Sequence, residues 1–315
     1  MPRVVVTRAL PEPALRALRE SGADVWVSPE DRALDAGELR AAVRGADTVV
    51  SMLHDRIDDE LLAAAGAQLR VVANVAVGYD NVDLEAARRH GVTITNTPGV
   101  LTDATADLAI ALMLAITRRL GEGERRIRSG TPWAWSIDFM LGRGLHAKTL
   151  GIVGYGAIGR ATAARARAFG MEVVHTRRSR GPEPGRVELD ELLECAHVVS
   201  LHCPLTPETR HLIDAGALAR MRADAYLVNT ARGPVVDEAA LAAALREGAI
   251  AGAALDVFER EPAVEPGLVE LDNVVLVPHL GSATVETRTA MAELAAANAV
   301  AVLAGESPPT PVLAA

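Results

Sequence analysis

The chain has 315 residues and a formal net charge of −9, and half of its residues are hydrophobic while only 3 % are aromatic. This length suffices for two domains, each with its own hydrophobic core. The acidic balance argues against a protein that binds nucleic acids or membrane surfaces through electrostatics. The first residues predict a strand rather than a signal peptide, and the most apolar helix, residues 108–116, is too short to span a bilayer. We therefore expect a cytoplasmic protein.

The two cysteines, Cys195 and Cys203, are expected to be reduced thiols. A disulfide between them is the alternative, but Cys203 ends an apolar strand-like run and the chain opens without a secretory signal. The histidines do not show the spacing of metal ligands, and we expect no metal.

Short apolar runs and helical segments alternate over the first hundred residues. The apolar runs are residues 4–6, 25–27, 48–53, 69–75 and 92–95. The segments of helical period between them include residues 12–21, 36–44 and 59–65. Alternation at this spacing predicts βαβ units, in which a parallel sheet is covered by helices on both faces.

A second βαβ series follows a long helix (residues 103–119) and a polar stretch that contains Trp133 and Trp135. Its expected strands are residues 149–153, 172–176, 197–202, 225–229, 251–256 and 274–277. A last helix, residues 285–303, is expected to have no sheet strand after it. We expect this helix to pack on the first domain.

Gly154, Gly156 and Gly159 stand in the G-x-G-x-x-G spacing between an apolar strand and an Ala/Arg-rich helix of residues 160–169. The first glycine permits a tight turn, the second lets the backbone approach a pyrophosphate, and the third lets helix and strand pack closely. The helix N-terminus offers N–H groups and partial positive charge to phosphates. With a strand before it and a helix and strand after it, the motif predicts dinucleotide binding.

The second strand of this series ends in His-Thr-Arg-Arg-Ser-Arg (175–180), without the acidic residue that usually receives a free ribose 2′-hydroxyl. Arg177 and Arg178 instead offer charge-assisted hydrogen bonds to a 2′-phosphate. Ser179 and Arg180 extend this polar segment. An exposed loop without a role in binding is the alternative. The missing acid favours NADPH as the cofactor, with NADH second.

Three polar residues in the last third of the chain, Arg232, Glu261 and His279, lie after apolar runs. A cation, a carboxylate and an imidazole are the groups needed to bind a 2-oxo acid and to protonate its carbonyl as hydride arrives. Because a neighbouring carboxylate stabilises imidazolium, Glu261 is expected to keep His279 a proton donor. Taken singly, a surface arginine, a solvated turn and a core histidine are the alternatives.

With these segments the chain resembles the D-isomer-specific 2-hydroxyacid dehydrogenases, and within them the glyoxylate/hydroxypyruvate reductases. The resemblance covers nearly the whole length. Besides the glycine motif, it rests on residues 76–83, 100–107, 229–233, 256–262 and 278–284.

The resemblance implies two doubly wound, parallel-sheet α/β domains that hold the substrate between them. One is a Rossmann-type dinucleotide-binding domain, residues 100–284, and the other a flavodoxin-like, discontinuous substrate-binding (lid) domain, residues 1–99 with 285–315. It also implies a homodimer, with the helix of residues 103–119 in the interface. In such a dimer, Trp133 and Trp135 either cap a neighbouring subunit's cleft or pack under their own loop.

The resemblance further implies a role for each matching residue. Arg232 would bind the substrate carboxylate and polarise the keto oxygen, His279 would be the general acid, and Glu261 its hydrogen-bond partner. The expected substrate contacts of the lid domain are Leu53, Val77 and Gly78. The positions expected to line the cofactor, besides the glycines, are Ala157, Ile158, Arg177, Arg178, Cys203, Thr230, Asp256 and Ser282.

The chain departs from the family pattern at Ala157, where a basic residue is frequent, at Asp107, where glutamate is usual, and at Tyr155, an uncommon residue between the first two glycines. These changes leave the catalytic groups in place. Phosphoglycerate and phosphite dehydrogenases share the motifs and remain alternatives, whereas a formate-oxidising relative would have glutamine in place of Glu261. A nucleotide-sensing, corepressor-like protein is the non-enzymatic alternative. The sequence favours an NADPH-preferring reductase of glyoxylate and hydroxypyruvate.

Overall fold

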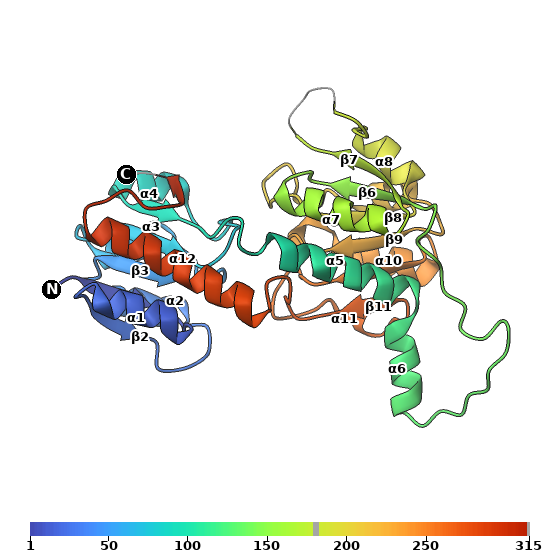
Figure 1. The fold of residues 1–315 in the computed structure, drawn as a ribbon, viewed down its shortest axis with the longest axis horizontal. Coiled ribbons are helices and arrows are strands. Elements are labelled where there is room, and N and C mark those ends of the chain that lie inside the picture. The colour runs from blue at the N-terminus through green and yellow to red at the C-terminus, as the bar shows by residue number, and fades with distance from the viewer. Residues whose placement is uncertain (179–182, 314–315) are drawn as a thin grey trace. The chain divides into compact units, whose positions relative to one another are not determined.

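The computed structural model describes residues 1–178 and 183–313, which form two compact α/β units (Figure 1). The first unit comprises Met1–Leu101 and Ala283–Ala315, and the second comprises Thr102–Ser282. Each unit is built on one six-stranded sheet. Within the described residues, no helix combines the length and the apolar composition needed to cross a membrane.

The sheet of the first unit has the strand order β12-β5-β4-β3-β1-β2. Its strands are β1 (Arg3–Val6), β2 (Asp24–Val27), β3 (Thr48–Ser51), β4 (Val71–Asn74), β5 (Thr93–Thr95) and β12 (Pro311–Leu313). β1 to β5 run parallel. The order reverses at β1, which makes the crevice between the carboxyl ends of β1 and β3 the switch point where such sheets commonly bind ligands.

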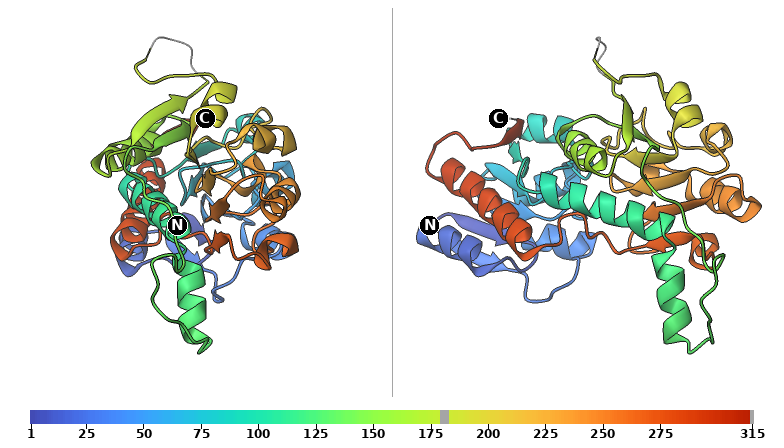
Figure 2. Two further views of the ribbon diagram at one scale, coloured as in Figure 1. Left: turned by 90° about the vertical axis from the view of Figure 1, so that its right-hand side faces the viewer. Right: turned by 45° about the vertical axis from the view of Figure 1, so that its right-hand side comes forward.

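Helices cover both faces of this sheet because the side chains of each strand alternate between two cores. Val4 and Val6 of β1 pack in one core and Val5 in the other. On the first face lie α1 (Glu12–Glu20) and α12 (Val285–Leu303), side by side in Figure 2. On the second face lie α2 (Ala36–Ala42), α3 (Asp59–Ala65) and α4 (Leu84–His90). An aspartate side chain caps the start of each of these three helices, at Asp35, Asp58 and Asp83.

The prediction that no strand follows the last helix is wrong. β12 pairs antiparallel with β5 and places Pro311 opposite Thr95. Prolines at 308, 309 and 311 count against a strand in the sequence, but β12 lies at the edge of the sheet, where a missing N–H can face away from the ladder. The expected return of the last helix to the first domain is confirmed by the packing of α12 on α1, β3 and β4.

The sheet of the second unit is parallel throughout, with the order β11-β10-β9-β8-β6-β7. Its strands are β6 (Thr149–Val153), β7 (Glu172–Thr176), β8 (Val198–Leu201), β9 (Tyr226–Asn229), β10 (Gly252–Leu255) and β11 (Val274–Leu276). Here the order reverses at β6, so the switch point lies between β6 and β8.

Helices again cover both faces. On one face lie α5 (Thr102–Thr117) and α7 (Ala157–Ala168), and on the other α8 (Leu189–Cys195), α9 (Ala215–Arg220), α10 (Glu238–Glu247) and α11 (Pro266–Val269). The 3-10 turn η1 (Gly233–Val235) follows β9. Leu227 and Val228 of β9 face opposite cores, as parallel strands buried on both sides require.

One part of the second unit stands away from its core: α6 (Leu120–Arg128) and residues 129–144, which we call the arm (Figures 1 and 2). Every residue of α6 is at least partly exposed. Within the arm, Trp133 stacks on Phe139, with ring centroids 6.1 Å apart, while Trp135 is 78 % exposed.

Candidate active site

The glycine turn directly follows β6 and needs glycine for two separate reasons. Gly154 has a φ of +97°, which side-chain-bearing residues rarely adopt. A Cβ on Gly154 would also lie 2.5 Å from the backbone nitrogen of Cys203, because the ends of β6 and β8 meet at the switch point. A Cβ on Gly159 would lie 2.3 Å from the carbonyl oxygen of Gly154. Larger residues at either position would force the turn apart.

This turn fits the pyrophosphate of a dinucleotide. Gly156 is the N-cap of α7, and apart from its chain neighbours and the adjoining helix backbone no described atom lies within 4 Å of the place where its Cβ would be. Gly156 and Ala157 are exposed, Ile158 is half-buried, and α7 presents its first N–H groups at this end. An open helix N-terminus at a switch point is a ready anion site.

His279 and Glu261 lie together at the edge of the sheet where the parallel strands end. His279 Nδ1 is 2.9 Å from Glu261 Oε2, and the two side chains are 27 % and 32 % exposed. Burial raises the pKa of Glu261, but the hydrogen bond and charge of His279, the hydrogen bond from Phe258 N–H and the charge of Arg232 together outweigh burial, and the pKa lies below the ordinary value of 4.5. Glu261 is therefore a carboxylate at neutral pH. A carboxylate on Nδ1 fixes the proton there and leaves Nε2 as the nitrogen through which the ring serves a substrate.

A buried aspartate holds the turn that carries His279. The carboxylate of Asp256 accepts hydrogen bonds from the N–H groups of Leu280 and Gly281, and the carbonyl of Asp256 accepts one from His279 N–H at 2.8 Å. His279 has a φ of +53°, a conformation that costs energy in a residue other than glycine and persists where the surroundings enforce it. Asp256, 1 % exposed, provides this enforcement.

Arg232 lies on a turn between β9 and η1 that side-chain hydrogen bonds hold in place. Asn229 spans this turn: its side chain accepts from Ala231 N–H at 3.0 Å and donates to the carbonyl of Arg232 at 3.0 Å. A Cβ on Gly233 would lie 1.8 Å from the carbonyl carbon of Phe258. The Arg232 turn and the 256–261 segment are thus in direct backbone contact. Arg232 is half-buried and close enough to Glu261 for its charge to help lower the pKa of that carboxyl.

A second histidine–carboxylate pair lies on the same segment. His211 Nε2 is 2.6 Å from Glu259 Oε1, and His211 N–H donates to the carbonyl of Pro234 at 2.8 Å. Glu259 and the buried Glu238 each accept a hydrogen bond from the other's backbone N–H, at 3.3 and 2.7 Å. Burial raises the pKa of Glu238. This cluster joins the Arg232 turn to the Glu261 turn, and the sequence signalled it only through the pairs of acidic residues at 237–238 and 259–261.

The remaining expected cofactor positions lie at the carboxyl ends of β7, β8, β9 and β11. The thiol of Cys203 is buried, which raises its pKa to about 11, so it is a neutral thiol. Both cysteines are free. Thr230 is 8 % exposed, Ser282 is half-buried and Arg178 is exposed. Arg177 forms an ion pair with Glu183 at 2.9 Å. Ser179 and Arg180 lie outside the described residues.

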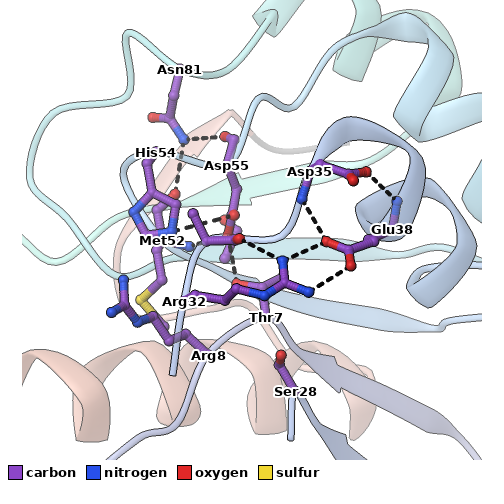
Figure 3. A network of polar contacts seen from close by, with 12 residues as sticks. Thr7, Arg8, Ser28, Arg32, Asp35, Glu38, Met52, His54, Asp55 and Asn81 are labelled. Carbon is purple, nitrogen blue, oxygen red and sulfur yellow. Dashed lines mark hydrogen bonds and ion pairs between the residues drawn. The ribbon is translucent and has the colours of Figure 1, made fainter. Parts of the chain in front are cut away.

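The first unit fixes the segment that contains Leu53. Figure 3 shows Asp55 at its centre, 2 % exposed, accepting hydrogen bonds from the hydroxyl of Thr7 and from Met52 N–H. Asn81 donates to the carbonyls of Met52 and Asp55 at 3.3 and 2.8 Å. Since Thr7 follows β1 and Met52 follows β3, these contacts tie together the switch point of the first sheet.

The Val77–Gly78 turn is anchored in the same way. The buried Asn74 donates to the carbonyl of Gly78 at 3.0 Å, and Asn96 donates to the carbonyl of Val77 at 2.8 Å. Asp55, Asn74 and Asn81 were missed as contributors by sequence reasoning. Asn74 ends the buried strand β4 and Asp55 lies just beyond β3, a place where side chains that hold loops are expected, whereas Asn81 lies seven residues beyond β4 and does not share this signal.

Comparison with known proteins places this geometry in a family. Residues 110–281 match the description D-isomer specific 2-hydroxyacid dehydrogenase, NAD binding domain. The glyoxylate reductase of Thermococcus litoralis is 47 % identical over 320 residues, which span 98 % of this chain and 96 % of that protein. The chain belongs to the D-isomer-specific 2-hydroxyacid dehydrogenases. It is therefore an NAD(P)-dependent oxidoreductase with a nicotinamide dinucleotide as cofactor and small 2-oxo or 2-hydroxy acids as substrates.

Solved structures of other proteins agree with this fold over the whole chain. A protein from Thermus thermophilus matches with a TM-score of 0.94 and 49 % identity, covering 99 % of this chain and 100 % of that one. The NADPH-dependent glyoxylate/hydroxypyruvate reductase from Sinorhizobium meliloti, in complex with NADP and malonate, matches with a TM-score of 0.88 and 35 % identity. That match covers 99 % of this dehydrogenase and 96 % of the Sinorhizobium chain.

Proposed function

We propose that this dehydrogenase reduces small 2-oxo acids, with glyoxylate and hydroxypyruvate as substrates and NADPH preferred over NADH. The observation that carries the proposal is the His279–Glu261 pair, 2.9 Å apart, at the carboxyl edge of the sheet that also bears the glycine turn. The names of the Thermococcus and Sinorhizobium relatives support the choice of substrates.

The residues divide the chemistry as follows. The guanidinium of Arg232 holds the substrate carboxylate and stabilises the negative charge that grows on the keto oxygen. A bound nicotinamide supplies the hydride. His279 delivers a proton from Nε2 to the same oxygen, and Glu261, bonded to Nδ1, stabilises the charged imidazole beforehand. Leu53, Val77 and Gly78 are the proposed substrate contacts of the first unit, and Asp55, Asn74 and Asn96 hold the segments that carry them.

Initial rates with a panel of 2-oxo acids, each with NADPH and NADH, test this proposal. We expect glyoxylate and hydroxypyruvate to be reduced with higher kcat/KM than pyruvate or larger acids. Faster oxidation of phosphite or phosphoglycerate than reduction of any 2-oxo acid would assign a different dehydrogenase activity. Tight NADPH binding without turnover of any of these compounds would favour a nucleotide-sensing protein.

The cofactor preference rests on Arg177 and Arg178. Arg177→Ala is expected to lower the ratio of kcat/KM for NADPH to that for NADH by about tenfold or more, because a charged hydrogen bond contributes about 1.5–3 kcal/mol. Arg88→Ala, which removes an exposed arginine paired with Glu85 in the first unit, is the matched control and should leave the ratio unchanged. An unaltered ratio in Arg177→Ala, or NADH as the better cofactor of the wild type, would contradict the assignment.

We infer that the enzyme is a homodimer, because the arm carries a concentration of exposed apolar side chains. These are Leu120, Ile127, Trp133, Trp135, Ile137 and Leu141, each between 56 % and 83 % exposed. Patches of this kind on a protein surface usually mark an interface. Light scattering should give twice the chain mass of 33.1 kDa, and Ile137→Glu should shift the protein toward monomer. Val285→Glu, at an equally exposed apolar residue of α12, should not; a monomeric wild type would overturn the inference.

A further inference from the structure

Residues 183–187, where the described part of the chain resumes, lie against β7 and are fixed there by backbone contacts. His175 N–H donates to the carbonyl of Gly185 at 2.8 Å, and Val187 N–H donates to the carbonyl of His175 at 3.0 Å. Gly185 has a φ of +80°, and a Cβ there would lie 3.0 Å from the carbonyl oxygen of Val173. Residues 183–187 are therefore held against the end of β7 by backbone contacts.

His175 connects this segment to the glycine turn. Its ring is buried, with Nε2 3.3 Å from the carbonyl of Pro184. On the other side the ring stacks on Tyr155, with centroids 3.7 Å apart and an angle of 6° between the planes. Tyr155 stands between the first two glycines of the turn. The stack gives this uncommon residue a structural role, since it sets residues 183–187 at a defined place beside the pyrophosphate site.

Glu183 is the residue that this arrangement brings to Arg177. The ion pair measures 2.9 Å, and the side chains of Arg177 and Glu183 are 33 % and 25 % exposed. Arg177 is the first residue after β7, where a dinucleotide of this fold places its adenosine ribose. The carboxylate of Glu183 therefore lies at the expected ribose position beside Arg177, although β7 itself ends without an acidic residue.

We propose that Glu183 determines how strongly the enzyme discriminates between NADPH and NADH, by competing with the 2′-phosphate for Arg177. With NADH, the carboxylate accepts a hydrogen bond from the free ribose hydroxyl, as the acid at the strand end does in other dinucleotide folds. With NADPH, Arg177 exchanges Glu183 for the phosphate, and the carboxylate repels the phosphate charge. The inference rests on the proposed cofactor site and goes beyond it, because it assigns the acid to a loop.

Dissociation constants measured by titrating the purified enzyme with NADPH and with NADH, following nicotinamide fluorescence, test this without any turnover. In Glu183→Gln the ratio of Kd for NADH to Kd for NADPH should rise by about tenfold, since one repulsive charge is removed and one charged acceptor is lost. Glu188→Gln is the matched control: its carboxylate follows in the same segment but is 85 % exposed, 3.5 Å from Arg186. The control should leave the ratio at the wild-type value.

The double variant Arg177→Ala/Glu183→Gln identifies the path of the effect. If Glu183 acts mainly by competing for Arg177, most of the gain in NADPH affinity seen in Glu183→Gln is lost when Arg177 is absent, and only the part due to direct repulsion of the phosphate remains. An unchanged Kd ratio in Glu183→Gln, or an equal gain in NADPH affinity without Arg177, overturns the inference. Neither result affects the proposed reductase function, which fails separately if the wild type binds both nucleotides but reduces no 2-oxo acid.

Discussion

Replacing His279 with alanine is expected to lower kcat for glyoxylate by about 10²- to 10⁴-fold, the range that a positioned proton donor contributes. The proton for the new hydroxyl must then come from water, which Glu261 does not position as it positions the imidazole of His279. Binding of NADPH should be nearly unchanged, because the glycine turn follows β6 and Arg177 follows β7, whereas His279 follows β11. Rates at saturating substrate and the Kd of NADPH, measured on the same preparation, separate the two effects.

The backbone at His279 requires a second variant. Because the φ of residue 279 is +53°, alanine at this position adds backbone strain. A loss of folding caused by this strain could be mistaken for a loss of catalysis. Asparagine tolerates this region better and removes the imidazole all the same. His279→Asn should therefore be as slow as His279→Ala, with a melting temperature closer to the wild type. His90→Ala, which removes a histidine paired with Asp59 in the first unit, should have wild-type activity. Near-normal kcat in His279→Asn would remove His279 from the chemistry.

Arg232→Gln is expected to have the second large effect, with kcat falling about 10²- to 10³-fold, as when a donor to a developing oxyanion is lost. KM for the 2-oxo acid should rise as well, since the same guanidinium holds the carboxylate. Arg232→Lys should be intermediate, because a lysine keeps the charge and loses the paired hydrogen bonds. The measurement is a full set of kcat and KM values with glyoxylate at saturating NADPH.

Arg260 provides the matched control for Arg232. It lies on the segment that carries Glu261, and its side chain is 72 % exposed and pairs with Glu265. Arg260→Gln should retain wild-type kinetics. Equal losses in Arg232→Gln and Arg260→Gln would point to a general disturbance of the 256–265 region instead of a role in substrate binding.

The strands of both sheets could be predicted because each is a short apolar run between helical segments, and the α/β fold class is confirmed. β12 could not, because three residues at an edge gain their stability from pairing with β5 and show no periodicity of their own. The last helix is observed with its expected bounds, residues 285–303, and the structure shows that the side chain of Thr284 caps its start. Local sequence signals thus predicted most helices and strands, whereas β12 depends on pairing with a strand far away in the sequence.

The candidate site divides along the same line. Gly154 was predictable because a tight turn needs glycine and Gly159 because helix and strand pack closely there, and their close contacts bear out both reasons. The ion pair between Arg177 and Glu183 was not, since six positions separate the two residues and only the fold brings them together. The expected place of Asp256 beside the cofactor stays a prediction, and the structure adds that its carboxylate accepts hydrogen bonds from the backbone next to His279. The sequence identifies a buried acidic residue, but it does not predict which groups donate hydrogen bonds to its carboxylate.

One measurement tests the reductase assignment most directly: reduction of hydroxypyruvate with NADPH that carries deuterium at the transferable position, followed by chiral and mass analysis of the product. We expect D-glycerate with one deuterium on C2, formed by the wild type and at a greatly reduced rate by His279→Asn. L-glycerate, product without deuterium, or equal rates for the two proteins would contradict the account.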